Sequence, residues 1–369
     1  MTQFMNEIII ASAGSGKTTK IVNDSLATPF QKILIITYTN NNFYEIETKF
    51  YKLNGFIPAN VTILTWFGFL LCHFVKPYQN SVYDNHRIAG INFVPGKSTP
   101  FIKKSNIKEY FLDDNDKIYT DKISEFGLKC NKKSKGLVLV RLEKLYKHLY
   151  IDEVQDLAGY DIEILKILLH SQIDITLVGD HRQATYSTNQ SSKNKKYSGA
   201  NIIDKFKEWE RKNKCTIINL NKSHRCNQEI CDFADIVYPH PFKTISKNTK
   251  TTEHDGIFVI GSNDVQRYVE KFSPQALLYN KTTNCLGLNA LNFGASKGLS
   301  FDRILIFPHG PLKKMLSKGD ISAISKSAAK VYVAITRARN SVTFVLDDTC
   351  QLNGIETYQF PNLNESSPV

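Results

Sequence analysis

The segment Ala11-Ser-Ala-Gly-Ser-Gly-Lys-Thr-Thr19 decides the fold class of this chain. It follows Glu7-Ile-Ile-Ile10, a short apolar run typical of a buried strand, and precedes Ile21-Val-Asn-Asp-Ser-Leu26, which can continue as a helix. A small-residue loop between a strand and a helix directs successive backbone N–H groups and the helix dipole at one point, which favours an anion there. The segment therefore predicts a phosphate-binding loop at the start of an α/β domain.

The residue types in this loop suit a nucleoside triphosphate. Gly14 and Gly16 let the backbone approach a phosphate closely, Lys17 can reach the β- and γ-phosphates, and the Thr18 hydroxyl can bind Mg²⁺. Ala11 stands where the G-x-x-x-x-G-K-T pattern has its first glycine, and an ordinary glycine turn is the alternative interpretation. The expected nucleotide-binding residues here are Ala13, Gly14, Ser15, Gly16, Lys17, Thr18 and Thr19.

Composition limits the class of protein. With 369 residues, of which 42% are hydrophobic, the chain can form two or three domains with sizeable cores. No run approaches the roughly 18 apolar residues of a membrane span, and the N-terminus lacks the layout of a signal peptide. The seven cysteines form no C-x-x-C pair, which predicts free thiols in a cytoplasmic protein rather than disulfides or a zinc site.

The net charge of +12 has two interpretations. A basic chain favours phosphate-rich partners such as nucleic acid. The chain is also rich in Lys and Asn, as AT-rich coding would produce. Charge alone therefore favours a nucleic-acid partner only modestly.

Apolar runs alternate with helical patterns along most of the chain, which predicts parallel, doubly wound sheets. Polar segments follow the runs at the carboxyl ends, where such sheets bind ligands. The expected strands are residues 33–36, 61–64, 149–152 and 173–179, then 216–219 at the start of a second unit, and 257–260, 276–279, 303–307 and 341–345.

This alternation predicts the domain organisation. Residues 1–75 and 136–214 form the first domain, and residues 215–352 form the second, followed by a polar tail at 353–369. Residues 76–135 break the alternation with prolines, glycines and eleven lysines, and we interpret them as a small inserted subdomain. Its lysines could contact a nucleic-acid backbone, or they could form an ordinary solvated surface.

Two strand ends carry candidate catalytic side chains. Asp152 can hold Mg²⁺ and Glu153 can deprotonate the attacking water, because a cation would offset the repulsion between adjacent carboxylates. Gln183, after residues 177–180, is a candidate for sensing the γ-phosphate and placing the water. In the second half, Arg225 and Arg337 are candidates for stabilising the charge that phosphoryl transfer spreads over the γ-phosphate.

The order of these segments resembles that of the UvrD/Rep-like helicases of superfamily 1. The resemblance covers nearly the whole chain except about residues 76–135. It rests on the segments Ala-Gly-Ser-Gly-Lys-Thr (13–18), Thr-Tyr-Thr-Asn (37–40), Asp-Glu-Val-Gln-Asp (152–156), Gly-Asp-His-Arg-Gln-Ala-Thr-Tyr (179–186), Ser-His-Arg (223–225), Ser-Lys-Gly-Leu-Ser-Phe-Asp (296–302) and Val-Ala-Ile-Thr-Arg-Ala-Arg (333–339).

The resemblance implies two RecA-like P-loop NTPase domains, with ATP and Mg²⁺ between them and a small insertion in the first. It places Lys17, Thr18, Asp152, Glu153, Gln183, Arg225 and Arg337 on the family's catalytic positions. It also implies that Gly298 lies near the γ-phosphate and that His224 replaces a tyrosine that stacks on the nucleotide base. The positions implied to face single-stranded DNA are Tyr38, Asn40, Thr65, Trp66 and Tyr186.

Two departures from the family bear on function. Thr188 and Asn189 replace a tryptophan and an arginine that stack on DNA, and only a short connection separates residues 277–280 from Asn292, where relatives place a large second accessory subdomain. We expect an ATP-dependent single-stranded DNA translocase or helicase moving 3′ to 5′, with RNA as an alternative strand. The rival is a regulatory ATPase that senses nucleotide and DNA and activates a partner nuclease in anti-phage defence, in the manner of Gabija-like systems, without processive unwinding.

Overall fold

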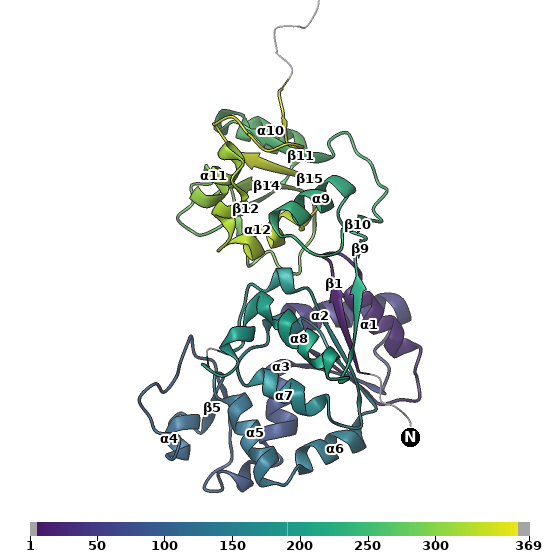
Figure 1. Cartoon of the computed structure of the whole chain (residues 1–369), viewed down its shortest axis with the longest axis vertical. Coiled ribbons are helices and arrows are strands. Elements are labelled where there is room, and N and C mark those ends of the chain that lie inside the picture. Colours follow the sequence, from purple (N-terminus) through teal and green to yellow (C-terminus); the bar gives the residue numbers. More distant parts are fainter. Residues whose placement is uncertain (1–5, 190, 361–369) are drawn as a thin grey trace, which may run out of the picture. The chain divides into compact units, whose positions relative to one another are not determined.

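Two units make up the chain, and each is built on its own six-stranded sheet (Figure 1). The computed structural model describes residues 6–189 and 191–360. The first unit runs as far as Leu220 but leaves out the tip of the glycine loop, Ser12–Ser15. The second unit contains this tip together with the chain from Asn221 onward.

The sheet of the first unit has the strand order β3-β2-β6-β7-β1-β8, and every pairing in it is parallel. Non-consecutive neighbours in this order require helical crossovers, which confirms the predicted doubly wound α/β class. The strands are β1 (Glu7–Ala11), β2 (Ile33–Thr37), β3 (Val61–Thr65), β6 (His148–Ile151), β7 (Asp174–Gly179) and β8 (Thr216–Leu220).

Side chains of these strands alternate between two cores. One core contains Ile9, Ile33 and Ile35 and is covered by α1 (Lys17–Leu26) and α2 (Asn40–Asn54). The other contains Ile8 and Leu34 and is covered by several further helices of the unit. These are α3 (Trp66–Phe69), which continues as a π-helical stretch Leu70–Val75, then α5 (Ile123–Lys133), α6 (Leu137–Leu145), α7 (Asp161–Leu168) and α8 (Ile202–Arg211).

The strand Thr216–Leu220 corrects one expectation. The sequence pattern predicted that residues 216–219 begin the second unit, but β8 pairs with β1 as the edge strand of the first sheet, with Ile8 opposite Ile217. Ile217 and Ile218 pack against the two different cores of that sheet. A short strand does not reveal from its own sequence which sheet it joins, because both sheets are parallel and apolar.

The inserted segment 76–135 does not have a core of its own. Phe111, Ile118 and Phe126 belong to the same cluster as Ile8 and Leu34 of the sheet. The segment contributes two short parallel strands, β4 (Gly90–Asn92) and β5 (Lys117–Tyr119), and the short helix α4 (Ile107–Phe111). Its position relative to the first sheet is therefore fixed by shared apolar packing.

The second unit repeats the parallel architecture with the order β13-β12-β14-β15-β11-β16. One face packs against α9 (Gln228–Val237), α11 (Gly310–Lys318) and α12 (Ala328–Ile335), and the other packs against α10 (Val265–Phe272). The strands are β11 (Gly256–Ile260), β12 (Gln275–Leu278), β13 (Leu291–Asn292), β14 (Phe301–Phe307), β15 (Ala338–Val345) and β16 (Glu356–Thr357), and a separate pair joins β9 (Lys222–Ser223) to β10 (Ile245–Ser246).

The C-terminal segment is more ordered than its polarity suggested. We expected residues 353–369 to be a polar tail outside the second domain, but β16 pairs with β11, and Tyr358 and Phe360 pack against the core beside α10. The remainder of that expected tail, residues 361–369, lies outside the described residues.

Two compositional expectations can be compared with the structure. All seven cysteines are free thiols, as predicted. Within residues 6–189 and 191–360, none of the helices is both long enough and apolar enough to cross a membrane.

Asp161 joins three separate parts of the first unit. Its buried carboxylate accepts a hydrogen bond from the Trp66 indole N–H at 3.0 Å and from the hydroxyls of Ser124 and Thr188. Burial raises the pKa of Asp161, although these donors favour its charged form. One carboxylate therefore holds α3, the insertion and the loop after β7 at a fixed spacing.

We expect Asp161→Ala to lower the free energy of unfolding by about 3 kcal/mol or more, because each buried donor left unpaired costs about 1–3 kcal/mol. Urea denaturation measures this loss. Asp114→Ala, at an exposed carboxylate of the insertion, is the matched control and should stay within about 0.5 kcal/mol of the wild type. An equally small effect of both substitutions would contradict the joining role of Asp161.

Candidate active site

The glycine loop follows β1 and ends where α1 begins at Lys17. Gly14 has a φ of 72° and Gly16, the residue before the helix, has a φ of 82°, a region in which side chains are strained. The first N–H groups of α1 have no partner within the helix and point toward the loop. The Gly-x-Gly spacing therefore has a conformational reason, and the geometry suits an anion at the start of α1.

The tip of the loop packs within the second unit. The Gly14 carbonyl accepts a hydrogen bond from the His224 N–H at 2.8 Å, and the Ala13 N–H donates to the Tyr332 hydroxyl at 3.3 Å. A Cβ on Gly14 would lie 2.6 Å from the Arg225 Cβ, so a larger residue at this position would force the backbone apart.

At the carboxyl edge of the first sheet, Lys17 meets the acidic segment that follows β6. Its ammonium lies 3.4 Å from a carboxylate oxygen of Glu153, and both side chains are 12% exposed. Glu153 adopts a φ of 57°, which is unusual for a residue with a side chain and costs of order 1–3 kcal/mol. Strain of this kind persists where the surroundings fix it and is common at functional sites.

Asp152 is buried beside this pair. Its carboxylate accepts a hydrogen bond from the Glu153 N–H at 2.9 Å. Burial, and next the charge of Glu153, raise the pKa of Asp152 to about 7, while Lys17 acts in the opposite direction. The first sheet thus holds a carboxyl group that is only partly ionised near neutral pH.

Gln155 links the segments after β6 and β7, and our sequence analysis assigned it no role. Its amide N–H donates to Glu153, and its carbonyl accepts from the Asp180 N–H at 3.1 Å. A Cβ on Gly179 would lie 2.3 Å from that carbonyl oxygen, so Gly179 makes room for the link. A glycine directly before an acidic turn was the available sequence signal.

The segment after β7 holds a second buried carboxylate in the opposite electrostatic state. Asp180 lies 3.5 Å from the Arg182 guanidinium and accepts a hydrogen bond from the Gln183 amide at 2.9 Å. Burial alone would raise the pKa of Asp180, but Arg182, then Lys17 and Gln183, hold it below its ordinary value. Gln183 is thereby fixed near the sheet edge with only 4% exposed.

The two candidate arginines lie together in the second unit. The Arg225 guanidinium donates to the Thr336 carbonyl at 3.1 Å. Arg337, 2% exposed, donates to the carbonyls of Val333 at 2.9 Å and Leu299 at 3.3 Å. Leu299 directly follows Gly298, which has a φ of 88°, so the loop that contains the candidate glycine lies against Arg337.

The donor set of the first unit suits Mg²⁺ by its chemistry. Thr18 lies in the first turn of α1, and Asp152 supplies a carboxylate, so the ligands are oxygens. In the ranges 6–189 and 191–360, no group of three or more His, Cys, Asp or Glu side chains could hold a metal ion. Mg²⁺ in phosphate sites commonly takes only one or two carboxylates together with substrate phosphates and water, so the residues fit.

The residues expected to face single-stranded DNA differ in exposure. Tyr38 is half-buried, Asn40 is exposed and Tyr186 is 42% exposed, whereas Thr65 caps α3 by accepting a hydrogen bond from the Gly68 N–H at 3.2 Å. Their strands end at the same edge of the sheet as the glycine loop.

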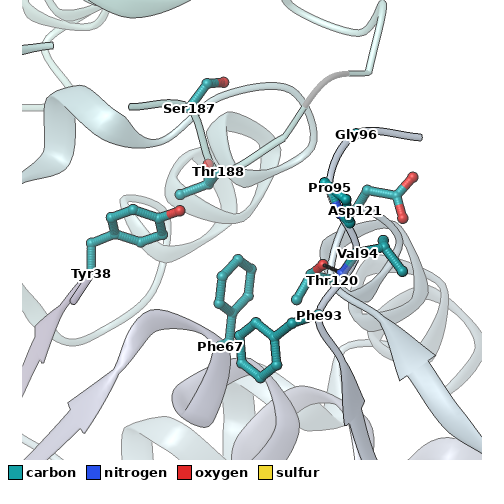
Figure 2. Close-up of a pocket in the computed structure, with 10 residues that line it drawn as sticks. All are labelled: Tyr38, Phe67, Phe93, Val94, Pro95, Gly96, Thr120, Asp121, Ser187 and Thr188. Carbon is teal, nitrogen blue, oxygen red and sulfur yellow. Dashed lines mark hydrogen bonds between the residues drawn. The ribbon is translucent and has the colours of Figure 1, made fainter. Parts of the chain in front are cut away.

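Trp66 does not fit the expected role. Only 1% of it is exposed, and its indole N–H is directed at Asp161, so its ring has no face on which a base could stack. The next residue, Phe67, instead lines a cavity of about 310 Å³ together with Tyr38 (Figure 2). The helix that begins at Trp66 turns successive side chains in different directions, which the motif alone did not reveal.

Substitution of the two buried carboxylates by asparagine should change the stability of the protein in opposite directions. Asp180→Asn leaves the buried Arg182 without its partner charge, so we expect a loss of about 3–5 kcal/mol at neutral pH. Because the pKa of Asp180 is lowered, its contribution is present above the ordinary Asp pKa of about 4 and is lost as the pH falls below it. The deficit of the variant should therefore shrink in acid, as measured by urea denaturation.

Asp152→Asn should instead stabilise the protein in metal-free buffer. Because the folded state holds the Asp152 proton up to a pH of about 7, the wild type loses stability as the pH rises from about 4 toward 7. The gain of the variant should be larger at pH 8 than at pH 5, with EDTA present in both series. A loss of stability at pH 8 would show that Lys17 more than offsets the burial of Asp152.

Comparisons with known proteins find relatives among helicases. The family model of the UvrD/REP helicase N-terminal domain matches residues 105–202. The chain is 30% identical over 159 residues to the ATP-dependent DNA helicase Rep of Buchnera aphidicola subsp. Acyrthosiphon pisum. That match spans 40% of this chain and 23% of the Rep protein, which is less than a quarter of the relative's length.

The solved structures that match this chain include viral helicases. Arterivirus nonstructural protein 10 has a TM-score of 0.48 at 14% identity, covering 92% of this chain and 59% of its own, and its complex with DNA has a TM-score of 0.46 at 15% identity, covering 92% and 60%. The PRRSV helicase has a TM-score of 0.45 at 16% identity, covering 92% and 52%. The similarity to UvrD/Rep-like helicases therefore rests on the two sequence matches, of which the family model covers residues 105–202.

Proposed function

We propose that this chain is an ATP-dependent translocase or helicase that moves along single-stranded DNA from 3′ to 5′. The observation that carries the proposal is the Lys17–Glu153 pair, 3.4 Å apart, beside the buried Asp152 at the carboxyl edge of a parallel sheet. A cation and two carboxylates at such an edge, next to a glycine loop and a helix start, form an arrangement suited to phosphoryl transfer. The match to the UvrD/REP N-terminal domain supports nucleic acid as the partner.

In this proposal the glycine loop and α1 bind the triphosphate. The loop from Ala13 to Thr19 surrounds the phosphates, with the N–H groups at the start of α1 directed at them, and Lys17 neutralises the β- and γ-phosphates. Thr18 and Asp152 hold Mg²⁺, which polarises the γ-phosphate when it is bound. A bound cation would also favour the ionised form of Asp152 and so oppose the burial and the Glu153 charge that raise its pKa.

Glu153 serves as the base that takes a proton from the attacking water. In the structure it is paired with Lys17 and held by the Gln155 amide. When Lys17 turns to the phosphates, Glu153 loses one cationic neighbour and becomes a stronger base, while Gln155 keeps its orientation. We assign Gln183, whose amide donates a hydrogen bond to Asp180, the role of orienting the water.

We propose Arg337 and Arg225 as the groups that stabilise the charge developing on the γ-phosphate. Both are held by carbonyls around Thr336, so their guanidinium groups keep a fixed orientation. Arginines in this role contribute about 10³–10⁵ in rate. Gly298 and His224 complete the set of residues assigned to the nucleotide, and Tyr38, Asn40, Thr65 and Tyr186 are assigned to single-stranded DNA.

The expected result is DNA-stimulated ATP hydrolysis that depends on Lys17 and Glu153. Lys17→Ala and Glu153→Gln should each lower kcat at least about 100-fold, because each removes a charge used in the transition state. Lys20→Ala is the matched control, since Lys20 lies one turn further along α1, is 40% exposed and pairs with Asp24. Failure of single-stranded DNA to raise turnover in the wild type, or full activity of Lys17→Ala, would overturn the proposal.

Strand displacement separates a helicase from a translocase that does not unwind DNA. Duplexes with a 3′ or a 5′ single-stranded tail test the proposed direction, and we expect ATP-dependent displacement only with the 3′ tail. Thr188 and Asn189, which replace the family's stacking residues, are 7% and 5% exposed, and neither side chain has a broad flat face on which a base could stack. ATP hydrolysis stimulated by DNA without displacement from either tail would favour the regulatory ATPase.

A further inference from the structure

The cavity beside Tyr38 has three aromatic side chains from separate parts of the first unit (Figure 2). Tyr38 follows β2, Phe67 lies in α3, and Phe93 follows β4 of the insertion. Figure 2 shows Tyr38 and Thr188 on one side, the segment from Phe93 to Gly96 on the other, and the Phe67 ring between them. The cavity measures about 310 Å³ and is also lined by Val94, Pro95, Gly96, Thr120, Asp121, Ser187 and Thr188.

The three rings meet edge to face. Centroids of Tyr38 and Phe67 lie 6.0 Å apart with an interplanar angle of 64°, and those of Phe67 and Phe93 lie 6.0 Å apart at 84°. Tyr38 and Phe67 pack against the main core of the unit, whereas Phe93 is 71% exposed and belongs to none of the hydrophobic clusters of the described residues. Phe93 therefore holds an aromatic face at the cavity without contributing to a core.

Backbone contacts fix Phe93 in this position. It directly follows β4, which pairs with β5, and the Thr120 N–H donates to the Asn92 carbonyl at 3.0 Å. The Val94 N–H donates to the Thr120 hydroxyl at 3.3 Å, and the Ser98 N–H donates to the Asp121 carboxylate at 3.2 Å. The segment that carries Phe93 is thus held at both ends, so little ordering entropy is lost when a ligand binds.

The chemistry of the lining suits a flat, uncharged ring. The lining combines three aromatic side chains with the hydroxyl groups of Thr120, Ser187 and Thr188. Asp121 is the one charged lining residue, and its carboxylate is turned away from the three rings in Figure 2. A nucleobase stacks on aromatic rings and is bounded by polar edges, whereas a phosphate would find no cation among these lining residues.

We propose that this cavity binds one unstacked base of a single-stranded nucleic acid, and that Phe93 of the insertion supplies the outer stacking surface. The inference rests on the proposed function and adds Phe67 and Phe93 to the residues that bind the strand. It also gives the insertion a specific task, namely to close one side of a base-binding cavity. Stacking on an aromatic ring does not distinguish one base from another, so the site accepts any base.

The opposite wall connects the cavity with the acidic segment. The Thr188 N–H donates to the Asp156 carbonyl at 3.0 Å, and the Ala158 N–H donates to the Thr188 hydroxyl at 3.0 Å. Asp156 is the last residue of the segment that contains Asp152 and Glu153. A nucleobase that contacts Thr188 therefore touches a residue hydrogen-bonded to the segment that carries Asp152 and Glu153. Occupancy of the cavity should for this reason also alter ATP turnover.

Phe93→Ala tests the proposal against Phe101→Ala. Phe101 lies in the same insertion, is 94% exposed and does not line the cavity. Stacking of a base on an aromatic ring is worth about 1–3 kcal/mol, so Phe93→Ala should weaken binding of a fluorescein-labelled dT oligonucleotide about 5- to 150-fold by anisotropy at fixed salt. Phe101→Ala should bind as the wild type does, and Phe93→Trp should restore binding.

An abasic oligonucleotide of equal length removes the bases and keeps the phosphates. We expect wild type and Phe93→Ala to bind it equally, because the cavity contacts only a base. The same series with an RNA oligonucleotide shows whether the cavity distinguishes the two sugars, and melting temperatures confirm that each variant is folded.

The outcomes separate this proposal from the function on which it rests. Wild-type protein that neither binds single strands nor raises its turnover with them overturns the proposed function. Wild-type protein that binds them, together with Phe93→Ala of unchanged affinity, overturns the cavity proposal alone. Equal weakening by Phe93→Ala on normal and abasic strands would also overturn it, because the loss would then not concern a base.

Discussion

Parallel strand pairing in the first sheet is the constraint on which the candidate site depends. Because all six strands run in one direction, the loops after β1, β2, β3, β6 and β7 emerge at one edge. These loops contain the glycine loop, Tyr38, Thr65, Asp152 with Glu153, and Asp180 with Gln183. The direction of the strands alone therefore brings residues more than 160 positions apart in the sequence to the same edge of the sheet.

Electrostatics at this edge depends on two buried carboxylates. Asp180 has a cationic partner that lowers its pKa and keeps it ionised. Burial and the neighbouring Glu153 instead raise the pKa of Asp152, which favours its neutral form. One carboxylate thus stabilises the fold, and the other is kept at a cost in stability that a bound cation would relieve. Gln155 spans the two loops and ties the strained Glu153 to Asp180. The arrangement is the pattern expected when stability is given up locally for binding.

The insertion is part of the first unit in both packing and chemistry. Phe111 and Phe126 bury it in the core of the sheet, and Asp161 joins it to α3 and to the loop after β7. This attachment places Phe93 beside Phe67 and leaves its ring exposed. A segment that seemed in sequence to be a separate, basic subdomain instead forms one wall of an aromatic cavity.

The sequence by itself determined the α/β class, the parallel sheets and the main candidate residues. Strand periodicity and the Gly-Lys-Thr and Asp-Glu segments are local patterns. Such patterns can be recognised in one sequence without knowing which distant segments are in contact. Only the tertiary structure decided that Thr216–Leu220 joins the first sheet, that Trp66 is buried, and that Gln155 links two loops. Each of these depends on which distant segment packs against the residue. The cavity at Phe93 is of the same kind, because three rings from three segments form it and no one segment's sequence contains its pattern.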